Sequence, residues 1–453
     1  DHRDLHSLRR RQRQMCIRDR TKTERLKKGL MQELLTKGIG HMEFKDTEIG
    51  KIPKEWEVVK LIDAADYING YAFSPKDWKD EGLPIIRIQN LNDPEAEFNY
   101  FDGEIDNRYI VENGDLLFSW SASIGVYIWK RGKAVLNQHI FKVVPKNNIN
   151  KFYLYYALFL AIEQLKNRVH GSTMKHFKRG ELKTAFIPLP PLSEQQKISH
   201  VLMSIDKAIE AVDEAIAKAE RIKKGLMQEL LTRGIGHKEF KDKEIGRIPK
   251  EWKVVRLEEI TNKIIDSPHK IPKKSDQGVP FVSVNYMIKF PDRNFYIDEN
   301  KNGLEYISDD DLQDFVKRFN PEKGDILYSK WGTPGVAKLI NTEKKFIGSC
   351  SVALIKPRVD RIDSLFLVYT LNSNIIRRQI VPHSKTSTRT EIHIGHIKKL
   401  KIPLPPLPEQ QKIAQILSKW DELIELKKAK KEKLERMKKK IMELLLTGKV
   451  RVK

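Results

Sequence analysis

The sequence predicts an α+β protein with two similar α/β domains separated by two long antiparallel coiled-coil helices, arranged as a pseudo-two-fold internal repeat. Residues 25–61 (RLKKGLMQELLTKGIGHMEFKDTEIGKIPKEWEVVKL) recur almost unchanged at residues 221–257. A second pair follows, with FIPLPPLSEQQKI at residues 186–198 and KIPLPPLPEQQKI at residues 401–413. The copies lie about 200 residues apart, far beyond the roughly 20–50 residues of a solenoid repeat. A whole domain and its linker are therefore used twice.

The composition is that of a strongly basic protein with enough apolar residues for real cores. Of 453 residues, 40% are hydrophobic and 32% charged, and 84 basic against 61 acidic residues give a net charge of +23. Solvated lysines on helices explain part of this excess, but a basic body remains after the terminal segments are discounted. The balance favours a polyanionic partner, nucleic acid before a membrane surface.

Cysteine content and hydropathy exclude several other classes of protein. Only Cys16 and Cys350 occur, so the sequence offers neither a disulfide framework nor a four-thiolate metal site. The longest apolar run, residues 152–162, is too short to span a bilayer and predicts a buried helix. No secretory signal is recognisable, so we expect a cytoplasmic protein with no membrane partner.

The repeat also predicts the boundaries of the segments. Residues 1–20 have no periodicity and no counterpart in the second copy, and Met42 resembles a natural first residue. The predicted segments are a disordered or non-native extension (1–20), a short helix and linker copying the end of the first spacer (21–47), the first α/β domain (48–191), the first spacer helix and linker (192–247), the second α/β domain (248–406) and the second spacer helix (407–453).

Two long stretches predict helices with a coiled-coil seam. From residue 198, and again from residue 413, apolar residues recur at alternating steps of four and three. Lys223 interrupts the first seam, and Lys427, Lys431 and Lys438 interrupt the second. Each helix would be roughly 60 Å long, and antiparallel pairing accommodates the domain between them. The predicted interface residues are Ile198, Leu202, Ile205, Ile209, Val212, Ile216, Ile413, Leu417, Trp420, Ile424, Leu434 and Ile441.

Each α/β domain is expected to contain several strands followed by a helix. Alternation of apolar and polar residues, and turn signals such as Gly-Asp, predict these elements. In the first copy they are strands at 84–90, 114–119 and 135–144 and a helix at 152–169; in the second they are strands at 279–285, 324–329 and 347–355 and a helix at 365–380.

The residue patterns of catalysis are missing from the sequence. There is no N/D-P-P-Y/F motif of a methyltransferase and no glycine-rich phosphate loop after a strand. His393 and His396 are spaced as a metal pair but lack carboxylate or thiol company. Because no nucleophile, base and orienting group converge, we expect a binding protein with no catalytic residue and no metal site.

Differences between the two copies identify candidate DNA-contacting residues. Ile86 and Ile88 match Val282 and Val284, whereas the polar positions between and after them change. Arg suits guanine, and Gln or Asn suits adenine, at base edges. Ordinary divergence of surface residues is the better explanation for any one difference, but their concentration after the same strands favours DNA readout. The candidates are Tyr71, Arg87, Gln89, Asn90, Ser119, Trp120, Ser121, Asn137, Gln138, Ser172, Thr173, Lys175, His269, Lys270, Ser283, Asn285, Tyr286, Lys330, Trp331, Thr333, Ser384, Lys385, Thr386 and Arg389.

A set of motifs gives the chain a family resemblance: EIGKIPKEWEVVKL, GLPIIRIQNLN, GDLLFSW, VLNQHIFKV, GSTMKHF, and IPLPPLSEQQKI before a long helix. With their order and duplication, over about residues 42–453, the chain resembles the specificity (S) subunit of type I restriction–modification systems. The resemblance implies that the α/β domains are target recognition domains, each reading one half of a bipartite sequence in double-stranded DNA.

The resemblance also implies a set of partners. The helices would act as the spacer between half-sites and dock two methyltransferase (modification) subunits, joined by nuclease–translocase (restriction) subunits. S-adenosylmethionine, ATP and Mg would belong to those subunits, with no cofactor bound by this chain. The chain would be non-catalytic by itself, as part of a restriction endonuclease and adenine DNA methyltransferase complex.

Two alternatives stay open on the sequence. The chain could be an S-like module that acts with a separate or fused restriction–methyltransferase polypeptide. It could also be a basic coiled-coil scaffold whose domains bind RNA or protein.

Overall fold

In the computed structural model the chain forms two compact units. Unit 1 comprises residues 1–211 and 431–453, and unit 2 comprises residues 212–430. The structure describes residues 43–451 apart from 94, 122, 169–180, 268–272, 291–293, 296, 298–302, 309–315, 317–318 and 382–390. The predicted extension, the helix expected before residue 43 and Met42 lie outside the described residues.

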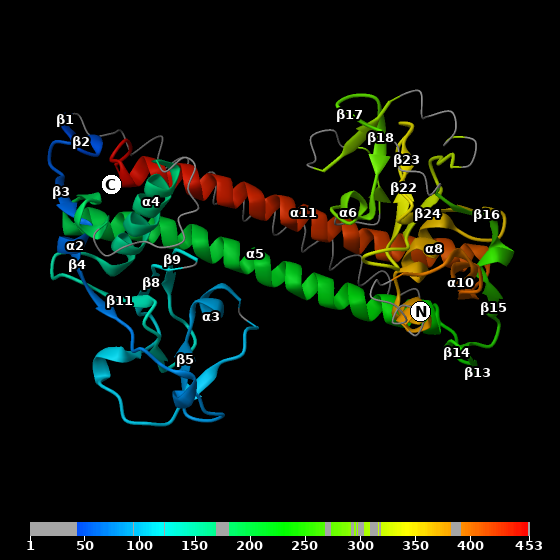
Figure 1. Ribbon diagram of the computed structural model, residues 1–453, viewed down its shortest axis with the longest axis horizontal. Coiled ribbons are helices and arrows are strands. Elements are labelled where there is room, and N and C mark those ends of the chain that lie inside the picture. The colour runs from blue at the N-terminus through cyan, green and yellow to red at the C-terminus, as the bar shows by residue number, and fades with distance from the viewer. Residues whose placement is uncertain are drawn as a thin grey trace. The chain divides into compact units, whose positions relative to one another are not determined.

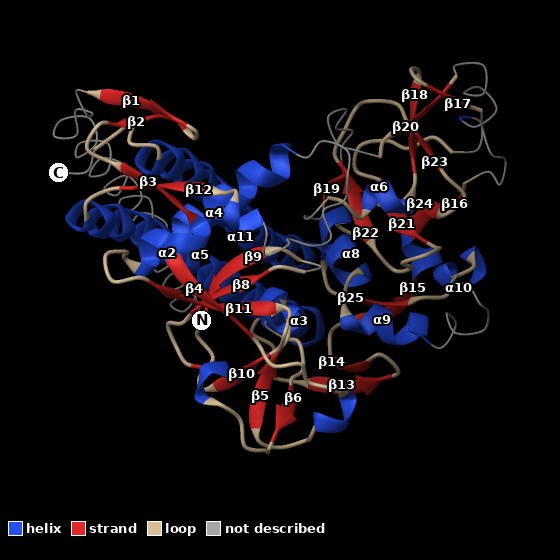
Figure 2. Cartoon of the chain, turned by 60° about the vertical axis from the view of Figure 1, so that its left-hand side comes forward, coloured by secondary structure: helices blue, strands red, loops and turns tan. Residues whose placement is uncertain are grey.

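Unit 1 contains two four-stranded sheets and one long helix of its own. Its elements are β1 (Phe44–Thr47), β2 (Gly50–Pro53), β3 (Glu57–Lys60), α2 (Leu61–Ala64), β4 (Ala65–Asn69), η1 (Pro75–Asp77), β5 (Leu83–Ile86), α3 (Ile88–Asn92), β6 (Asn99–Phe101), η2 (Asn107–Tyr109), β7 (Ile110–Val111), β8 (Leu116–Ser119), β9 (Gly125–Ile128), β10 (Ala134–Leu136), β11 (Ile140–Pro145), α4 (Lys151–Arg168), η3 (Glu181–Lys183) and β12 (Phe186–Leu189). One sheet has the order β4-β11-β8-β9 (Figure 2). The other has the order β6-β5-β10-β7, with β10 parallel to β5.

Unit 2 repeats this plan. Its elements are β13 (Phe240–Lys243), β14 (Gly246–Pro249), β15 (Lys253–Arg256), η4 (Leu257–Ile260), β16 (Thr261–Asp266), β17 (Lys274–Ser275), β18 (Val279–Val282), α6 (Val284–Met287), β19 (Asn294–Phe295), β20 (Glu305–Ile307), β21 (Ile326–Ser329), β22 (Ala337–Ile340), β23 (Ile347–Gly348), β24 (Val352–Pro357), α8 (Ser364–Leu371), α9 (Asn374–Ile380), α10 (Ile394–Lys398) and β25 (Lys401–Leu404). Its two larger sheets have the orders β16-β24-β21-β22-β19 and β17-β20-β18-β23, and β18 is parallel to β23 as β5 is to β10.

Two predicted strands, one in each unit, differ from the structure in the same way. The strand expected at 135–144 is two strands in different sheets, and the one at 347–355 is divided in the same manner. A turn causes each break, since Ile140 N donates to Asn137 O at 3.1 Å and Val352 N to Ser349 O at 3.0 Å. Apolar, strand-forming residues lie on both sides of each turn, so the sequence pattern does not reveal the change of sheet.

The strands expected at 84–90 and 279–285 are also shorter than predicted. β5 ends at Ile86 and α3 begins at Ile88, while β18 ends at Val282 and α6 begins at Val284. The helix expected at 365–380 is likewise broken between α8 and α9. Side chains close the first two of these turns, since Arg87 N donates to Asn90 Oδ1 and Tyr286 N donates to Ser283 Oγ, and periodicity does not reveal such contacts.

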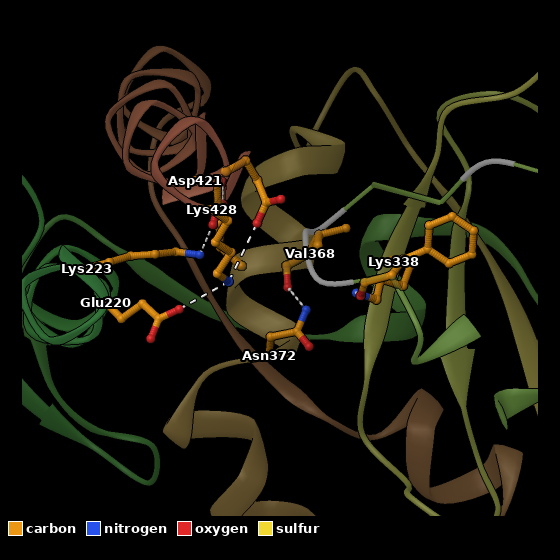
Figure 3. Close-up of polar contacts among 10 residues, drawn as sticks. Glu220, Lys223, Lys338, Val368, Asn372, Asp421 and Lys428 are labelled. Carbon is orange, nitrogen blue, oxygen red and sulfur yellow. Dashed lines mark hydrogen bonds and ion pairs between the residues drawn. The ribbon is translucent and has the colours of Figure 1, made fainter. Parts of the chain in front are cut away.

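Two long helices, α5 (Leu192–Arg233) and α11 (Leu407–Leu446), contribute to both units. They are green and red in Figure 1. In unit 1, Lys438 Nζ of α11 lies 2.6 Å from Asp206 Oδ1 of α5. In unit 2, Lys223 pairs with Asp421, and Lys428 Nζ lies 3.2 Å from Glu220 Oε1 (Figure 3). Because later residues of one helix pair with earlier residues of the other, the helices are antiparallel.

The predicted seam residues face inward in both units. Of the twelve, only Ile209 and Ile216 are partly exposed, and the others are buried. Lys223 and Lys438, which interrupt the apolar pattern, form the ion pairs just described. Their place in the seam therefore has an electrostatic explanation.

The repeated PLPPL-x-EQQKI motif anchors each long helix to its unit. Buried Gln195 donates to Pro190 O at 2.8 Å and to Asn148 O at 3.1 Å, and it accepts from Asn150 N at 2.8 Å. Gln410 makes the three matching bonds in unit 2. Buried amides with all partners in place hold the helix start in one position.

The residue before each of these glutamines binds a buried tryptophan. Trp56 Nε1 donates to Glu194 Oε2, and Trp252 Nε1 donates to Glu409 Oε2, both at 3.1 Å. Both indole rings are fully buried. Within the described residues, no helix is long and apolar enough to cross a membrane.

Candidate nucleic-acid interface

In unit 1 the two sheets meet where separate segments exchange backbone hydrogen bonds. Between β10 and β11, Asn137 N donates to Ile86 O at 3.2 Å and Gln138 N donates to Tyr71 O at 2.9 Å. Gly70 permits this close approach, because a Cβ there would lie 2.2 Å from Asn137 O. We call this place the sheet crossing of unit 1. It brings together three of the segments that carry predicted contact residues.

Arg87 is held in a fixed position beside this crossing. Its Cζ lies 5.0 Å from the centre of the Trp78 ring, and its Nη1 donates to Asn99 Oδ1 at 2.7 Å. Stacking and one hydrogen bond orient the guanidinium fork while its other N–H groups can serve a ligand. A planar fork of this kind matches the two acceptors of guanine in the major groove.

Aromatic side chains surround the same crossing. Trp120 Nε1 donates to Asn69 Oδ1 at 3.3 Å, and the Trp120 ring lies edge-on to His139 with centroids 5.4 Å apart. Tyr71 is 41% exposed and makes an edge contact with Tyr109 at 5.6 Å. Aromatic faces that are partly exposed can stack on bases or sugars, so this surface suits a nucleic acid.

Unit 2 has an equivalent sheet crossing. Ser349 N donates to Val282 O at 2.8 Å, and Lys330 N donates to Ser351 O at 2.8 Å. Ile392 N donates to Lys330 O at 3.1 Å, so the segment after α9 also reaches this place. The crossing therefore joins the same strand ends as in unit 1.

One pair of equivalent positions differs sharply in chemistry between the crossings. Where unit 1 has the neutral contact of Asn69 with Trp120, unit 2 has an ion pair between Asp266 and Lys330. The Lys330 side chain is only 2% exposed, whereas that of Asp266 is 37% exposed. A partly exposed carboxylate fixed by a buried ammonium group can accept hydrogen bonds from a ligand, such as the amino group of cytosine.

Asn90 and Ser119, two of the predicted DNA contacts, are buried and have structural partners. Buried Asn90 lies on α3, where its Oδ1 accepts from Arg87 N and its Nδ2 donates to Ala96 O and Glu97 O. The buried Ser119 hydroxyl accepts from Gly125 N at 3.0 Å and donates to a loop carbonyl. These side chains hold turns together and have no face towards a ligand.

Three more of the predicted contacts, Ser121, Tyr286 and Lys330, are also buried. Ser121 is buried, and Tyr286 is fully buried with its ring packed edge-on to Phe290 at 5.4 Å. Lys330 is committed to its pair with Asp266. Divergence between copies at these positions reflects different packing.

The other candidates on described residues have surface available. The exposed ones are Tyr71, Gln89, Asn285 and Thr333, and the partly exposed ones are Arg87, Trp120, Asn137, Gln138, Ser283 and Trp331. Nine candidates lie outside the described residues: Ser172, Thr173, Lys175, His269, Lys270, Ser384, Lys385, Thr386 and Arg389.

Several residues that shape these surfaces were not among the predicted contacts. Trp78, Asn99 and Arg108 have no counterpart pattern in the second copy, and Arg108 lies over the Tyr109 ring at 4.7 Å. Asp266 could have been found by aligning the ends of the strands that become β4 and β16. The others depend on a loop fold that the sequence does not encode locally.

No metal centre accompanies these surfaces in the described part of the chain, which holds no group of three or more His, Cys, Asp or Glu suited to a metal ion. The expectation that His393 lacks a carboxylate neighbour is wrong, because its Nδ1 lies 3.5 Å from Glu391 Oε1.

Known proteins resemble both halves of the chain. Residues 53–221 and 249–436 match the family described as type I restriction modification DNA specificity domain. The type I restriction enzyme MjaVIII specificity subunit of Methanocaldococcus jannaschii is 31% identical over 421 residues, covering 90% of this chain and 96% of that protein. A putative MjaX specificity subunit from the same organism is 33% identical over 443 residues, with 90% and 97% covered.

Solved structures support the fold. The S subunit of the type I restriction–modification system from M. genitalium has a TM-score of 0.52 at 15% identity, covering 86% of this chain and 96% of that chain. A chain from a study of complex assembly and conformational transition of the type I R-M system has a TM-score of 0.52 at 18% identity, covering 88% and 99%. The predicted fold class is confirmed.

Proposed function

Because the chain belongs to the family of type I restriction modification DNA specificity domains, we propose that it is the sequence-reading subunit of a type I restriction–modification complex. Each α/β domain acts as a target recognition domain for one half of a bipartite target in double-stranded DNA. The net charge of +23 supplies the sequence-independent attraction to phosphate.

The observation that carries this proposal is the pair of sheet crossings. Both units build the same backbone junction, yet the side chains available at it differ, with Arg87 fixed in unit 1 and Asp266 fixed in unit 2. A guanidinium donates hydrogen bonds and a carboxylate accepts them, so the two crossings suit different bases. Two domains with the same fold but different contact side chains fit a DNA target whose two halves differ in sequence.

The proposal extends to the partners of the chain. Two methyltransferase subunits dock on the paired helices, and nuclease–translocase subunits complete a complex that acts in the cytoplasm. Equivalent helix contacts in the two units, through Lys438 in one and Lys223 in the other, support two similar docking surfaces. S-adenosylmethionine, ATP and Mg bind to the partner subunits, and this chain contributes no catalytic residue.

The substitution Arg87→Ala tests the proposal. We expect it to relax the base preference at one position of one half-site by about 1–3 kcal/mol and to leave the other half-site unchanged. The measurement is selection from a randomised duplex library by the assembled complex, supported by mapping of methylated adenines in cells that carry it.

Arg131→Ala is the matched control, because it also removes a guanidinium stacked on aromatic rings, those of Phe98 and Trp129. An equal loss of affinity for every sequence would assign Arg87 to phosphate contact. Equal binding of specific duplex, scrambled duplex and RNA would instead favour the basic scaffold.

A further inference from the structure

Unit 2 receives the end of α5 in a well-defined site. Residues 220–234 form what we call the plug, and Trp252, Tyr369, Glu409 and Asp421 form the socket. Tyr369 donates from its hydroxyl to Asp421 Oδ2 at 2.6 Å, and Asp421 also pairs with Lys223 of the plug (Figure 3). The plug ends at Gly234, where a Cβ would lie 2.6 Å from Glu409 Oε1 and 2.7 Å from the Trp252 ring.

Unit 1 has the same socket, but its plug comes from the other end of the chain. Tyr156 donates to Asp206 Oδ2 at 2.7 Å, and Lys438 of α11 pairs with Asp206 at 2.6 Å. The plug, residues 435–449, contributes buried apolar residues to the core that contains Trp56. It has a glycine at Gly448, where a Cβ would lie 2.3 Å from Pro53 Cδ and 3.3 Å from Trp56.

The sequence contains a third copy of this plug. Residues 24–38 (ERLKKGLMQELLTKG) repeat residues 220–234 (ERIKKGLMQELLTRG) with two substitutions, and both align with residues 435–449 (ERMKKKIMELLLTGK). Lys27 corresponds to Lys223 and Lys438, so the third copy carries the cation of the ion pair. It lies outside the described residues.

The third copy stands in the chain where the unit 2 arrangement predicts the plug of unit 1. In unit 2 the plug runs directly along the chain into β13 and β14, and the corresponding sequence before β1 and β2 is residues 24–38. The unit 1 socket is nevertheless filled by residues 435–449. The sequence thus supplies three plugs for two sockets.

We propose that residues 24–38 are an alternative occupant of the unit 1 socket and compete with residues 435–449 for Asp206, Tyr156 and the apolar core. A short connection to β1 gives the third copy a high effective concentration at this socket. Gly29 stands where the α11 plug has Lys440, and an interior glycine weakens a helix roughly fivefold relative to alanine. The competition therefore favours α11, as the structure has it. The proposal is independent of DNA reading, because it concerns the contacts of the helix ends and none of the residues at the sheet crossings.

Hydrogen exchange of the full chain, followed by mass spectrometry, tests this exchange of plugs. Lys438→Glu sets a like charge against Asp206, and we expect protection of residues 441–449 to fall about tenfold or more. Protection of residues 24–38 should rise, while β11 keeps its protection because the socket stays filled. Adding Lys27→Glu should remove the gain at 24–38 and lower the protection of β11.

Lys439→Glu is the matched control, because Lys439 is exposed and brings the same change of charge. Gly29→Ala tests the proposal without removing any contact of residues 435–449. It should raise protection of residues 24–38 and lower that of 441–449 by about fivefold. No gain of protection at 24–38 in either Lys438→Glu or Gly29→Ala would overturn the proposal.

Discussion

Unit 1 and unit 2 carry different side chains at equivalent positions of the same backbone junction. At one pair of equivalent positions, unit 1 has Asn69 bonded to Trp120 and unit 2 has Asp266 paired with Lys330. Beneath both, a buried serine at the end of a central strand, Ser119 or Ser329, bonds the following loop. The two copies therefore share the hydrogen bonds that hold the sheet crossing together, while the side chains at its surface differ.

The helix anchors of the two units are, by contrast, almost identical. Gln195 and Gln410 make the same three bonds, and the Trp56–Glu194 and Trp252–Glu409 contacts have the same length of 3.1 Å. Contacts that close a unit around its helices tolerate little change, because the glutamines and tryptophans are buried and hydrogen-bonded. The two units therefore share the contacts that hold their helices and differ in the side chains at their sheet crossings.

The largest effect should come from the shared anchors. Trp56→Ala and Trp252→Ala each remove a fully buried indole together with its hydrogen bond to a glutamate. We expect each to lower the free energy of unfolding of its own unit by about 3–5 kcal/mol. Chemical denaturation followed by hydrogen exchange reports the units separately. Clearly unequal losses would show that the two anchors are not equivalent.

A smaller but unequal effect is expected at the divergent pair. Asp266→Ala leaves the buried Lys330 ammonium without this carboxylate, and we expect the free energy of unfolding to fall by about 2–4 kcal/mol. The loss is smaller than for a fully buried pair, because Asp266 is partly solvated. Asn69→Ala removes one neutral hydrogen bond and should cost about 0.5–1.5 kcal/mol. Urea unfolding of both variants provides the comparison. Similar losses would mean that Lys330 finds another partner.

Alkaline pH should affect unit 1 through a tyrosine that unit 2 lacks. Burial, together with Asp206 and Glu210, raises the pKa of Tyr155 from 10.0 to about 12. Since the pKa in the folded state is the higher one, the neutral ring stabilises unit 1 below pH 10, and this contribution is lost as the pH rises towards 12. Tyr155→Phe should flatten the fall in stability of unit 1 over that range. An unchanged pH profile would contradict this assignment.

The smallest effect is expected at the surface of the helix pair. Lys428 forms ion pairs with Glu220 at 3.2 Å and Glu425 at 3.6 Å while 38% exposed. Such pairs contribute little, so Lys428→Ala should change stability by less than about 0.5 kcal/mol. Salt titration of the melting temperature measures the contribution. A loss above 1 kcal/mol would mark this pair as part of the anchor.

The sequence by itself determined the duplication and the two long helices. Heptad spacing is a local property, and the near-identity of residues 25–61 and 221–257 is visible without a structure. Buried seam residues such as Leu202 and Leu417 follow from that periodicity alone.

Only the tertiary structure decided which polar residues face a ligand and which plug fills each socket. Asn90 and Lys330 have side chains typical of DNA contacts, but both are buried, Asn90 by the loop that follows α3 and Lys330 by its pair with the distant Asp266. Trp78 and Asn99 acquire a role only because loop closure brings them to Arg87. Solvent access and long-range hydrogen bonding depend on the whole chain, so a local pattern of polar residues cannot fix them.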